Sequence, residues 1–244
     1  MQREIDLART IQQSFLPERY PPLVGWSLAV EWRAVLGVGG DYYDFIQLDD
    51  QHLGLVIADV SGKGVGAAIY MALLRTVMRV TAFDQQGPGE TLRRVNRVLL
   101  EESRSGMFAS VFYGILNQET GVLTYARAGH NPPLFVHASD RRPESLCPEG
   151  IVLGVVERPN IQEDDIVFAP GDFMVAYTDG LTEANNDQVE EFGEERLSRV
   201  VQDLVSYDAD MIIDRVDAAL SAFTGTRAQF DDLTVLVLRR DEGL

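Results

Sequence analysis

The strand candidates of this chain come in closely spaced pairs. Runs rich in β-branched and aromatic residues cover 26–34, 42–48 and 52–60, and only residues 49–51 separate the last two runs. Because so short a connection joins antiparallel strands, 42–48 and 52–60 are predicted to form a hairpin. Short turns also separate two further pairs, 107–116 from 122–128 and 162–168 from 172–177. Such pairs favour an α+β architecture over a doubly wound parallel sheet.

Helical periodicity fills the remaining segments. Apolar residues at steps of three and four predict helices at 64–83, 89–103, 193–205 and 209–223. Further strands are expected at 134–137 and 234–239, with a loop near 141–143. The order is therefore strands, two helices, strands, two helices and a last strand. Two antiparallel sheets with a helix pair outside each would use all of these elements.

The N-terminal segment is predicted to be a separate helix at 2–16, ended by Pro17. Its apolar positions are Ile5, Ala8, Ile11 and Phe15. The stripe suits either an ordinary first helix on its own core or a connecting helix that meets a partner or a second copy. We expect 1–21 to be this connecting segment and 22–244 to be one domain.

The charge and the cysteine content exclude several classes of function. The formal charge of −17 argues against nucleic-acid binding through phosphate neutralisation and against docking on an anionic membrane, but not against a bound cation. Cys147 is the only cysteine, which excludes an intramolecular disulfide and makes the cytoplasm the default location. No signal peptide is evident, and no run approaches 18 apolar residues, so a membrane span is not expected.

Four aspartates stand where a strand end meets a glycine or a turn: Asp41, Asp59, Asp179 and Asp231. A carboxylate at the end of a buried strand is costly to desolvate unless it is paired or binds a cation, and few basic residues lie nearby in sequence. Each aspartate taken singly also suits a helix N-cap or a turn. Together, hard oxygen ligands of this kind suit Mg²⁺ or Mn²⁺, and two ions would need several carboxylates.

Other motifs for phosphate chemistry are incomplete. The glycine-rich run 59–66 lacks the P-loop spacing, because Lys63 is followed by Gly64. Residues 37–40 lack the third glycine of a dinucleotide fingerprint, and no G-x-S-x-G elbow occurs. His130, in the turn 128–133, suits an acid, a phosphate contact or a hydrogen bond that holds the loop.

Five separated segments occur in a recognisable order: 39–44 (GGDYYD), 58–64 (ADVSGKG), 128–133 (AGHNPP), 177–184 (YTDGLTEA) and 231–234 (DDLT). With these segments the chain resembles the SpoIIE/RsbU-type bacterial serine phosphatases, a branch of the PPM (PP2C-like) metal-dependent protein phosphatases. The resemblance implies a four-layer α-β-β-α sandwich and a centre of two divalent cations, Mn²⁺ or Mg²⁺. It covers about residues 4–240.

The resemblance also implies roles for single residues. Asp59 corresponds to the carboxylate that bridges both ions. Asp41 and the backbone carbonyl of Val60 correspond to ligands of one ion, and Asp179 and Asp231 to ligands of the other. Positions with less defined roles around the ligands are Asp44, Glu183 and Asp232. A metal-activated water would then attack phosphorus directly, so no phosphoenzyme is expected.

The partners implied by the resemblance belong to bacterial signalling. Family members remove phosphate from a phosphoserine of a STAS-domain anti-sigma-factor antagonist in a partner-switching cascade. An upstream sensory or receiver domain usually regulates them through a helix in the position of 2–16. In the family such helices pair with one another, which suggests a homodimer through this helix. Two other hypotheses remain: a catalytically silent binding module with the same fold, and hydrolysis of a small phosphorylated metabolite.

Overall fold

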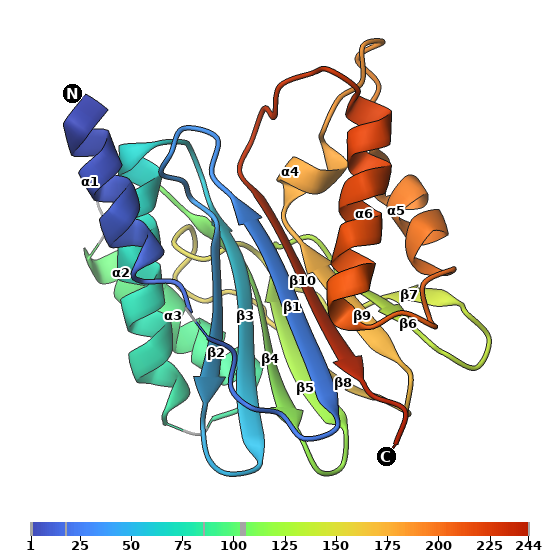
Figure 1. The fold of residues 1–244 in the computed structure, drawn as a ribbon. Coiled ribbons are helices and arrows are strands. Elements are labelled where there is room, and N and C mark those ends of the chain that lie inside the picture. The colour runs from blue at the N-terminus through green and yellow to red at the C-terminus, as the bar shows by residue number, and fades with distance from the viewer. Residues whose placement is uncertain (1, 18, 85, 103–105, 244) are drawn as a thin grey trace. The chain divides into compact units, whose positions relative to one another are not determined.

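The computed structural model describes residues 2–17, 19–84, 86–102 and 106–243. The chain divides into two compact units, each built around its own antiparallel sheet (Figure 1). Unit 1 contains Met1–Pro21, Leu36–Asn131 and Cys147–Val167, and unit 2 contains Pro22–Val35, Pro132–Leu146 and Phe168–Leu244. The N-terminal segment therefore groups with unit 1. The predicted boundary between 21 and 22 stays a prediction.

Unit 1 holds a sheet whose strand order, over the described residues, is β2-β3-β4-β5-β8. Its strands are β2 (Tyr42–Gln47), β3 (His52–Val60), β4 (Ala109–Asn117), β5 (Val122–Ala128) and β8 (Glu163–Val167). Its helices are α1 (Gln2–Gln13), α2 (Val65–Ala82) and α3 (Pro88–Glu102). Helix α2 packs on β2 and β3, α3 packs on β4 and β5, and α1 lies beside α2. The central strand β3 is almost entirely buried, which explains its continuous apolar run.

Helix α2 has an unusual composition. Among the described residues it is the one helix whose length and hydropathy would allow it to cross a membrane, and 39% of it is buried. Its buried positions, including Met71, Leu74 and Met78, lie at helical spacing and form one side of the helix. The core helix of a globular protein has the same composition, and α2 packs on the sheet in this way.

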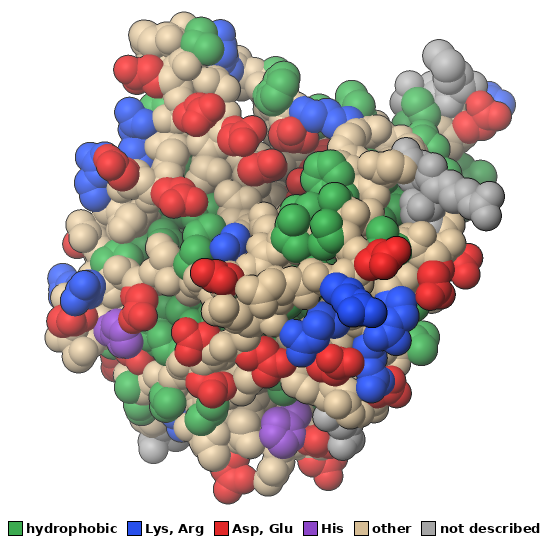
Figure 2. Space-filling view, turned by 180° about the vertical axis from the view of Figure 1, so that it is seen from behind, with side chains coloured by type: hydrophobic (Ala, Val, Ile, Leu, Met, Phe, Trp, Pro, Cys, Tyr) green, Lys and Arg blue, Asp and Glu red, His purple; other side chains and the backbone are tan. Residues whose placement is uncertain are grey.

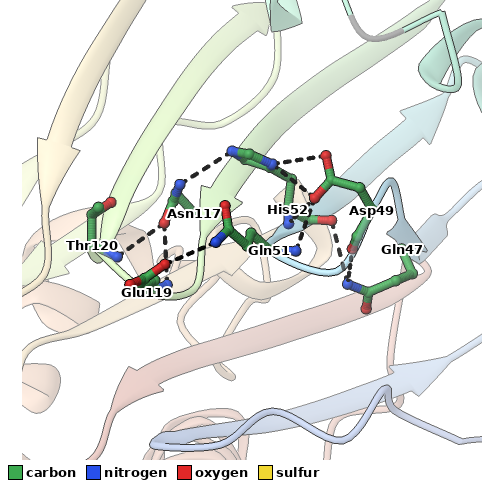
Figure 3. Close-up of polar contacts among 7 residues, drawn as sticks. All are labelled: Gln47, Asp49, Gln51, His52, Asn117, Glu119 and Thr120. Carbon is green, nitrogen blue, oxygen red and sulfur yellow. Dashed lines mark hydrogen bonds and ion pairs between the residues drawn. The ribbon is translucent and has the colours of Figure 1, made fainter.

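Side-chain contacts tie the β2–β3 turn to the β4–β5 turn (Figure 3). Asp49 accepts hydrogen bonds from the backbone N–H groups of Gln51 and His52 and contacts the His52 ring, which lowers the pKa of its carboxyl. His52 Nε2 lies 3.2 Å from Asn117 Nδ2, and Gln51 donates to Glu119. These contacts fix the register of the hairpin at its turn end.

Unit 2 holds the second sheet, with the order β1-β10-β9-β6-β7 over the described residues. Its strands are β1 (Trp26–Arg33), β6 (Leu134–Val136), β7 (Pro143–Ser145), β9 (Phe173–Tyr177) and β10 (Leu233–Arg240). Its helices are α4 (Asp179–Thr182), α5 (Gly193–Val201) and α6 (Ala209–Thr224). Apolar residues of β9, such as Val175, form one core cluster with Leu197 of α5 and Ile212 of α6. Strands β1 and β10 pair although the whole domain separates them in sequence.

The predicted strands and long helices are confirmed, apart from their ends. Strand β4 begins at Ala109 rather than at residue 107, because the backbone N–H and C=O of Phe108 bond to Ser61 instead of continuing the ladder. Helix α5 ends at Val201 and not at residue 205. The prediction was too long because Leu204 and Val205, which follow the helix, are also apolar and buried in the core. Ser103, the predicted end of α3, lies outside the described residues.

Two short elements were not predicted. The segment expected as a loop near 141–143 leads into β7, three residues that pair with β6. Helix α4, four residues long, follows β9 directly and begins at Asp179. Both are too short to show a period of 2 or of 3.6 in sequence.

Candidate functional site

The first pair of candidate ligands, Asp41 and Asp59, lies in unit 1 at the open end of the β2–β3 hairpin. The two strands pair with Tyr42 opposite Ala58. Continuing this register by one residue would place Asp41 opposite Asp59. Side chains that are directly opposite in an antiparallel pair point to the same face, about 4.5–5.5 Å apart at Cβ, so this register favours neighbouring positions for the two carboxylates.

Two backbone segments approach each other closely beside Asp41 and Asp59. A Cβ atom on Gly40 would lie 2.6 Å from the carbonyl oxygen of Val60 and 3.3 Å from Asp59 Oδ1, so only glycine fits. Asp41 is only 1% exposed, and Asp59 is half-buried. An Asp59 carboxylate oxygen and the Val60 carbonyl thus both lie beside Gly40, the residue before Asp41, and oxygen groups of this kind fit a hard divalent cation.

The second pair, Asp179 and Asp231, lies in unit 2 at the end of the β9–β10 pair. Thr178 and Thr234 bond to each other twice and fix the strands where β9 ends, one residue before Asp179. A Cβ atom on Gly180 would overlap the carbonyl oxygen of Asp232. The segments 177–184 and 231–234, far apart in sequence, therefore meet at glycine distance, and both aspartates are half-buried.

The Gly180 contact supports a test of stability. Gly180→Ala is expected to destabilise the protein by at least the 1–3 kcal/mol that is typical of overpacking, because the obstructing atom is backbone oxygen and cannot rotate away. Urea unfolding would measure this loss. The matched control is Gly66→Ala in α2, where an added Cβ meets no atom within 4 Å and should be neutral or stabilising. Equal stability of Gly180→Ala and the parent would contradict the close approach.

The three motif residues without a defined role, Asp44, Glu183 and Asp232, differ in their surroundings. Asp44 is fully buried and accepts hydrogen bonds from Arg79 and from the Tyr42 hydroxyl. Asp232 accepts a hydrogen bond from the backbone N–H of Val35, and Glu183 is exposed. Asp44 and Asp232 thus hold neighbouring elements in place.

The His130 side chain contacts Ser110 of β4, a residue that was not predicted to belong to the site. His130 is 1% exposed, and its Nδ1 lies 2.7 Å from the Ser110 hydroxyl oxygen. Ser110 lies opposite Asp59 across β3 and β4. Arg127 donates to the carbonyl of His130 and so holds the turn. A serine inside a strand carries no motif, and only the strand pairing shows its position.

Unit 2 also contains a cavity of about 560 Å³ beside its carboxylate pair. Its lining includes Gly180, Asp231, Arg33 and Phe230. Arg33 is held by Asp217 and Glu31, at 2.5 and 2.7 Å. This cavity was not predicted, because its walls come from β1, α4 and the end of α6, which are far apart in sequence.

The case for a metal centre depends on pairs of candidate carboxylates. Over the described residues, no three His, Cys, Asp or Glu side chains form a group that could hold a metal ion. Each unit supplies two of the four predicted carboxylate ligands, with a glycine at close backbone distance in both cases. Lys63, in the turn after Asp59, is exposed.

Comparison with solved structures defines the class of the fold. The SiaA-PP2C domain of Pseudomonas aeruginosa has a TM-score of 0.87 with this chain, covering 98% of the chain and 96% of that domain at 21% identity. The two antiparallel sheets with their helices are therefore the α+β fold of PP2C domains, as the strand order and the resemblance predicted.

Sequence comparison identifies the family. The model of the Stage II sporulation protein E (SpoIIE) family matches residues 49–241, and the chain belongs to this family. Protein IcfG of Synechocystis is 31% identical over 98% of the chain, and phosphoserine phosphatase RsbU of Bacillus subtilis is 28% identical over 97%. The chain spans 42% of the length of IcfG and 70% of that of RsbU.

Proposed function

We propose that the chain is a metal-dependent protein phosphatase that hydrolyses phosphoserine. The observation that carries this proposal is that in each unit two of the motif segments with a candidate carboxylate meet at a glycine contact, Gly40 at Val60 and Gly180 at Asp232. The activity named for the relative RsbU, phosphoserine phosphatase, supports it. The proposed ligands are Asp41, Asp59, the Val60 carbonyl, Asp179 and Asp231.

These side chains would act as ligands and not as nucleophiles. Bound Mn²⁺ or Mg²⁺ lowers the pKa of a coordinated water and offsets charge on the phosphoryl oxygens. Asp41 and Asp59 would supply carboxylate oxygens and Val60 its carbonyl oxygen, and the closeness of Gly40 to Val60 O and to Asp59 Oδ1 supports this set. Because none of these groups needs to form a bond to phosphorus, the chain should pass through no phosphoenzyme.

The proposed substrate is a phosphorylated STAS-domain anti-sigma-factor antagonist, and the proposed context is partner switching in sigma-factor regulation. The charge of −17 bears on this encounter. Acidic side chains are spread over the face shown in Figure 2, with Lys or Arg side chains among them. An acidic phosphoprotein would be repelled at long range, so its association rate should rise as salt screens the charges.

The N-terminal helix is the proposed route of regulation. Ile11 of the predicted apolar stripe of α1 is 48% exposed, and Leu7, which flanks the stripe, is 61% exposed, so apolar side chains of this helix lie on the surface. We propose that these residues pair with a second copy in a homodimer and respond to an upstream sensory or receiver domain. The cytoplasm is the proposed location, since one cysteine leaves no disulfide to form within the chain.

A phosphate-release assay tests the proposed activity. With Mn²⁺, the chain should release phosphate from phosphorylated STAS proteins of the source genome, and EDTA should abolish the release. Binding of the partner without turnover under Mn²⁺ would overturn the proposal and favour the catalytically silent module. Faster hydrolysis of small phosphorylated metabolites than of the phosphoprotein would favour the metabolite hypothesis, and the cavity beside Asp231 would then be the place to examine.

A further inference from the structure

The cavity of unit 2 combines buried apolar residues with one large aromatic residue on the surface. Its lining includes Leu220 and Leu233, which are 6% and 3% exposed, and Phe230, which is 69% exposed. Among the described residues, Phe230 is the most exposed phenylalanine. A hollow with an apolar lining and an aromatic side chain beside it is typical of a surface that binds another molecule.

The segment that carries Phe230 is fixed by hydrogen bonds. It joins α6 to β10, and residues 227–230 form no helix or strand (Figure 1). The Gln229 side chain donates to the backbone carbonyl of Arg33 at 3.0 Å and to that of Asp231 at 2.7 Å. Gln229 and Asp231 flank Phe230, so these bonds hold the backbone at Phe230 beside the end of β1.

The two arginines of the cavity lining already have acidic partners. Arg33 forms ion pairs with Glu31 and Asp217. Arg227 lies 3.9 Å from Asp187. An anionic ligand would have to compete with these carboxylates, whereas an apolar group would gain by leaving water. The cavity therefore favours an apolar group over a charged one.

The cavity is continuous with the proposed metal site of unit 2, because Asp231 belongs to its lining. Phe230 is the residue directly before Asp231. A phosphoserine bound at this site would bring its own neighbours in sequence to the cavity, since three extended residues span about 10 Å. The group that reaches the cavity most directly is thus a side chain of the same substrate, close to the phosphoserine.

We propose that this cavity is a substrate-recognition subsite: it binds a large apolar side chain that lies within three residues of the phosphoserine, against Phe230. The inference rests on the proposed phosphoserine phosphatase activity and on Asp231 as a metal ligand. Such a contact supplies short-range attraction for an acidic partner that the charge of −17 repels at long range. Phe230 acts on substrate binding and not on the chemical step.

The test uses phosphopeptides in which alanine surrounds a central phosphoserine. One phenylalanine is placed in turn at each of the three positions before and after the phosphoserine, and kcat and KM are measured with Mn²⁺. For the parent chain, at least one placement should raise kcat/KM about 10-fold over the all-alanine peptide, chiefly through a lower KM. Burial of one large apolar side chain has an effect of this order.

Variants of the chain locate the preference. Phe230→Ala should lose it and still hydrolyse the all-alanine peptide at the parental rate. Its unfolding in urea should match the parent, because most of this side chain is exposed. Phe230→Leu should keep part of the preference, since leucine is apolar but smaller. The matched control is Phe83→Ala: Phe83 is 57% exposed at the end of α2, in the other unit, so this variant should keep the preference.

The outcomes for the two proposals are distinct. Equal kcat/KM for all placements in the parent, or an unchanged preference in Phe230→Ala, would overturn the inference and leave the proposed function standing. If only a phosphorylated STAS protein is hydrolysed, its KM should rise in Phe230→Ala and not in Phe83→Ala, and an unchanged KM would overturn the inference. If neither peptides nor phosphoproteins release phosphate with Mn²⁺, the proposed function fails and the inference falls with it.

Discussion

An Asp59→Asn variant is expected to lose nearly all phosphatase activity and to remain folded. The loss should exceed the roughly 10–100-fold that follows removal of a group outside the ligand shell, because Asp59 is proposed to be a metal ligand itself and would bridge the cations. An amide has nearly the same shape but carries no negative charge, so it cannot bridge two cations as a carboxylate does. Initial rates at saturating Mn²⁺ measure the effect, and circular dichroism measures the fold.

The matched control for this change is Asp165→Asn in β8. Asp165 belongs to the same unit and is exposed, so the same loss of charge should leave the rate unchanged. Full activity of Asp59→Asn would remove the central ligand from the proposed mechanism. Equal losses in both variants would contradict a specific role of Asp59, because the loss of one negative charge should, if anything, speed the encounter with an acidic partner.

The second large effect is expected for Arg79→Met. Arg79 donates from Nε and Nη2 to Asp44 at 2.6 and 2.7 Å, and Asp44 is fully buried. Burial and the Asp44 charge raise the pKa of Tyr42, whose hydroxyl donates to the same carboxylate. Removing Arg79 leaves a buried carboxylate without its cation, at a cost of about 3 kcal/mol, the low end of the range for such pairs because Arg79 itself is partly exposed.

Two comparisons test that explanation by urea unfolding. Asp44→Asn should cost less than Arg79→Met, since the partly exposed guanidinium can turn to water whereas the buried carboxylate cannot. Arg94→Met should cost less than about 1 kcal/mol, because its partners Asp84 and Glu90 are both solvent-accessible. A cost for Arg79→Met no greater than that for Arg94→Met would show that water reaches Asp44.

The hairpins of unit 1 were predictable from local signals. The pairs β2–β3 and β4–β5 each combine alternating or continuous apolar runs with a short polar turn, and both hairpins formed as expected. Helices α2, α3 and α6 were predicted for a similar reason, since their apolar positions repeat at helical spacing. These elements carry their own turn and period signals within a few residues.

The candidate ligands could also be predicted from sequence, but the residues that contact the segments around them could not. Each of the four aspartates follows or precedes an apolar run, and a charge at that place is conspicuous. Gln12 and Ser110 are not conspicuous, because a glutamine in a helix and a serine in a strand are ordinary residues. Their contacts with Gly39 and with His130 depend on which segments pack together.

The sequence by itself determined the elements, the α+β class, the acidic surface and the four carboxylates. The tertiary structure alone decided how the hairpins and the strands outside them are grouped into sheets. Strands β8 and β9 are joined by a short turn but belong to different sheets, whereas β1 and β10 pair from opposite ends of the domain. The physical reason is that such pairing depends on burial and backbone hydrogen bonds between distant segments, and no short window of sequence records it.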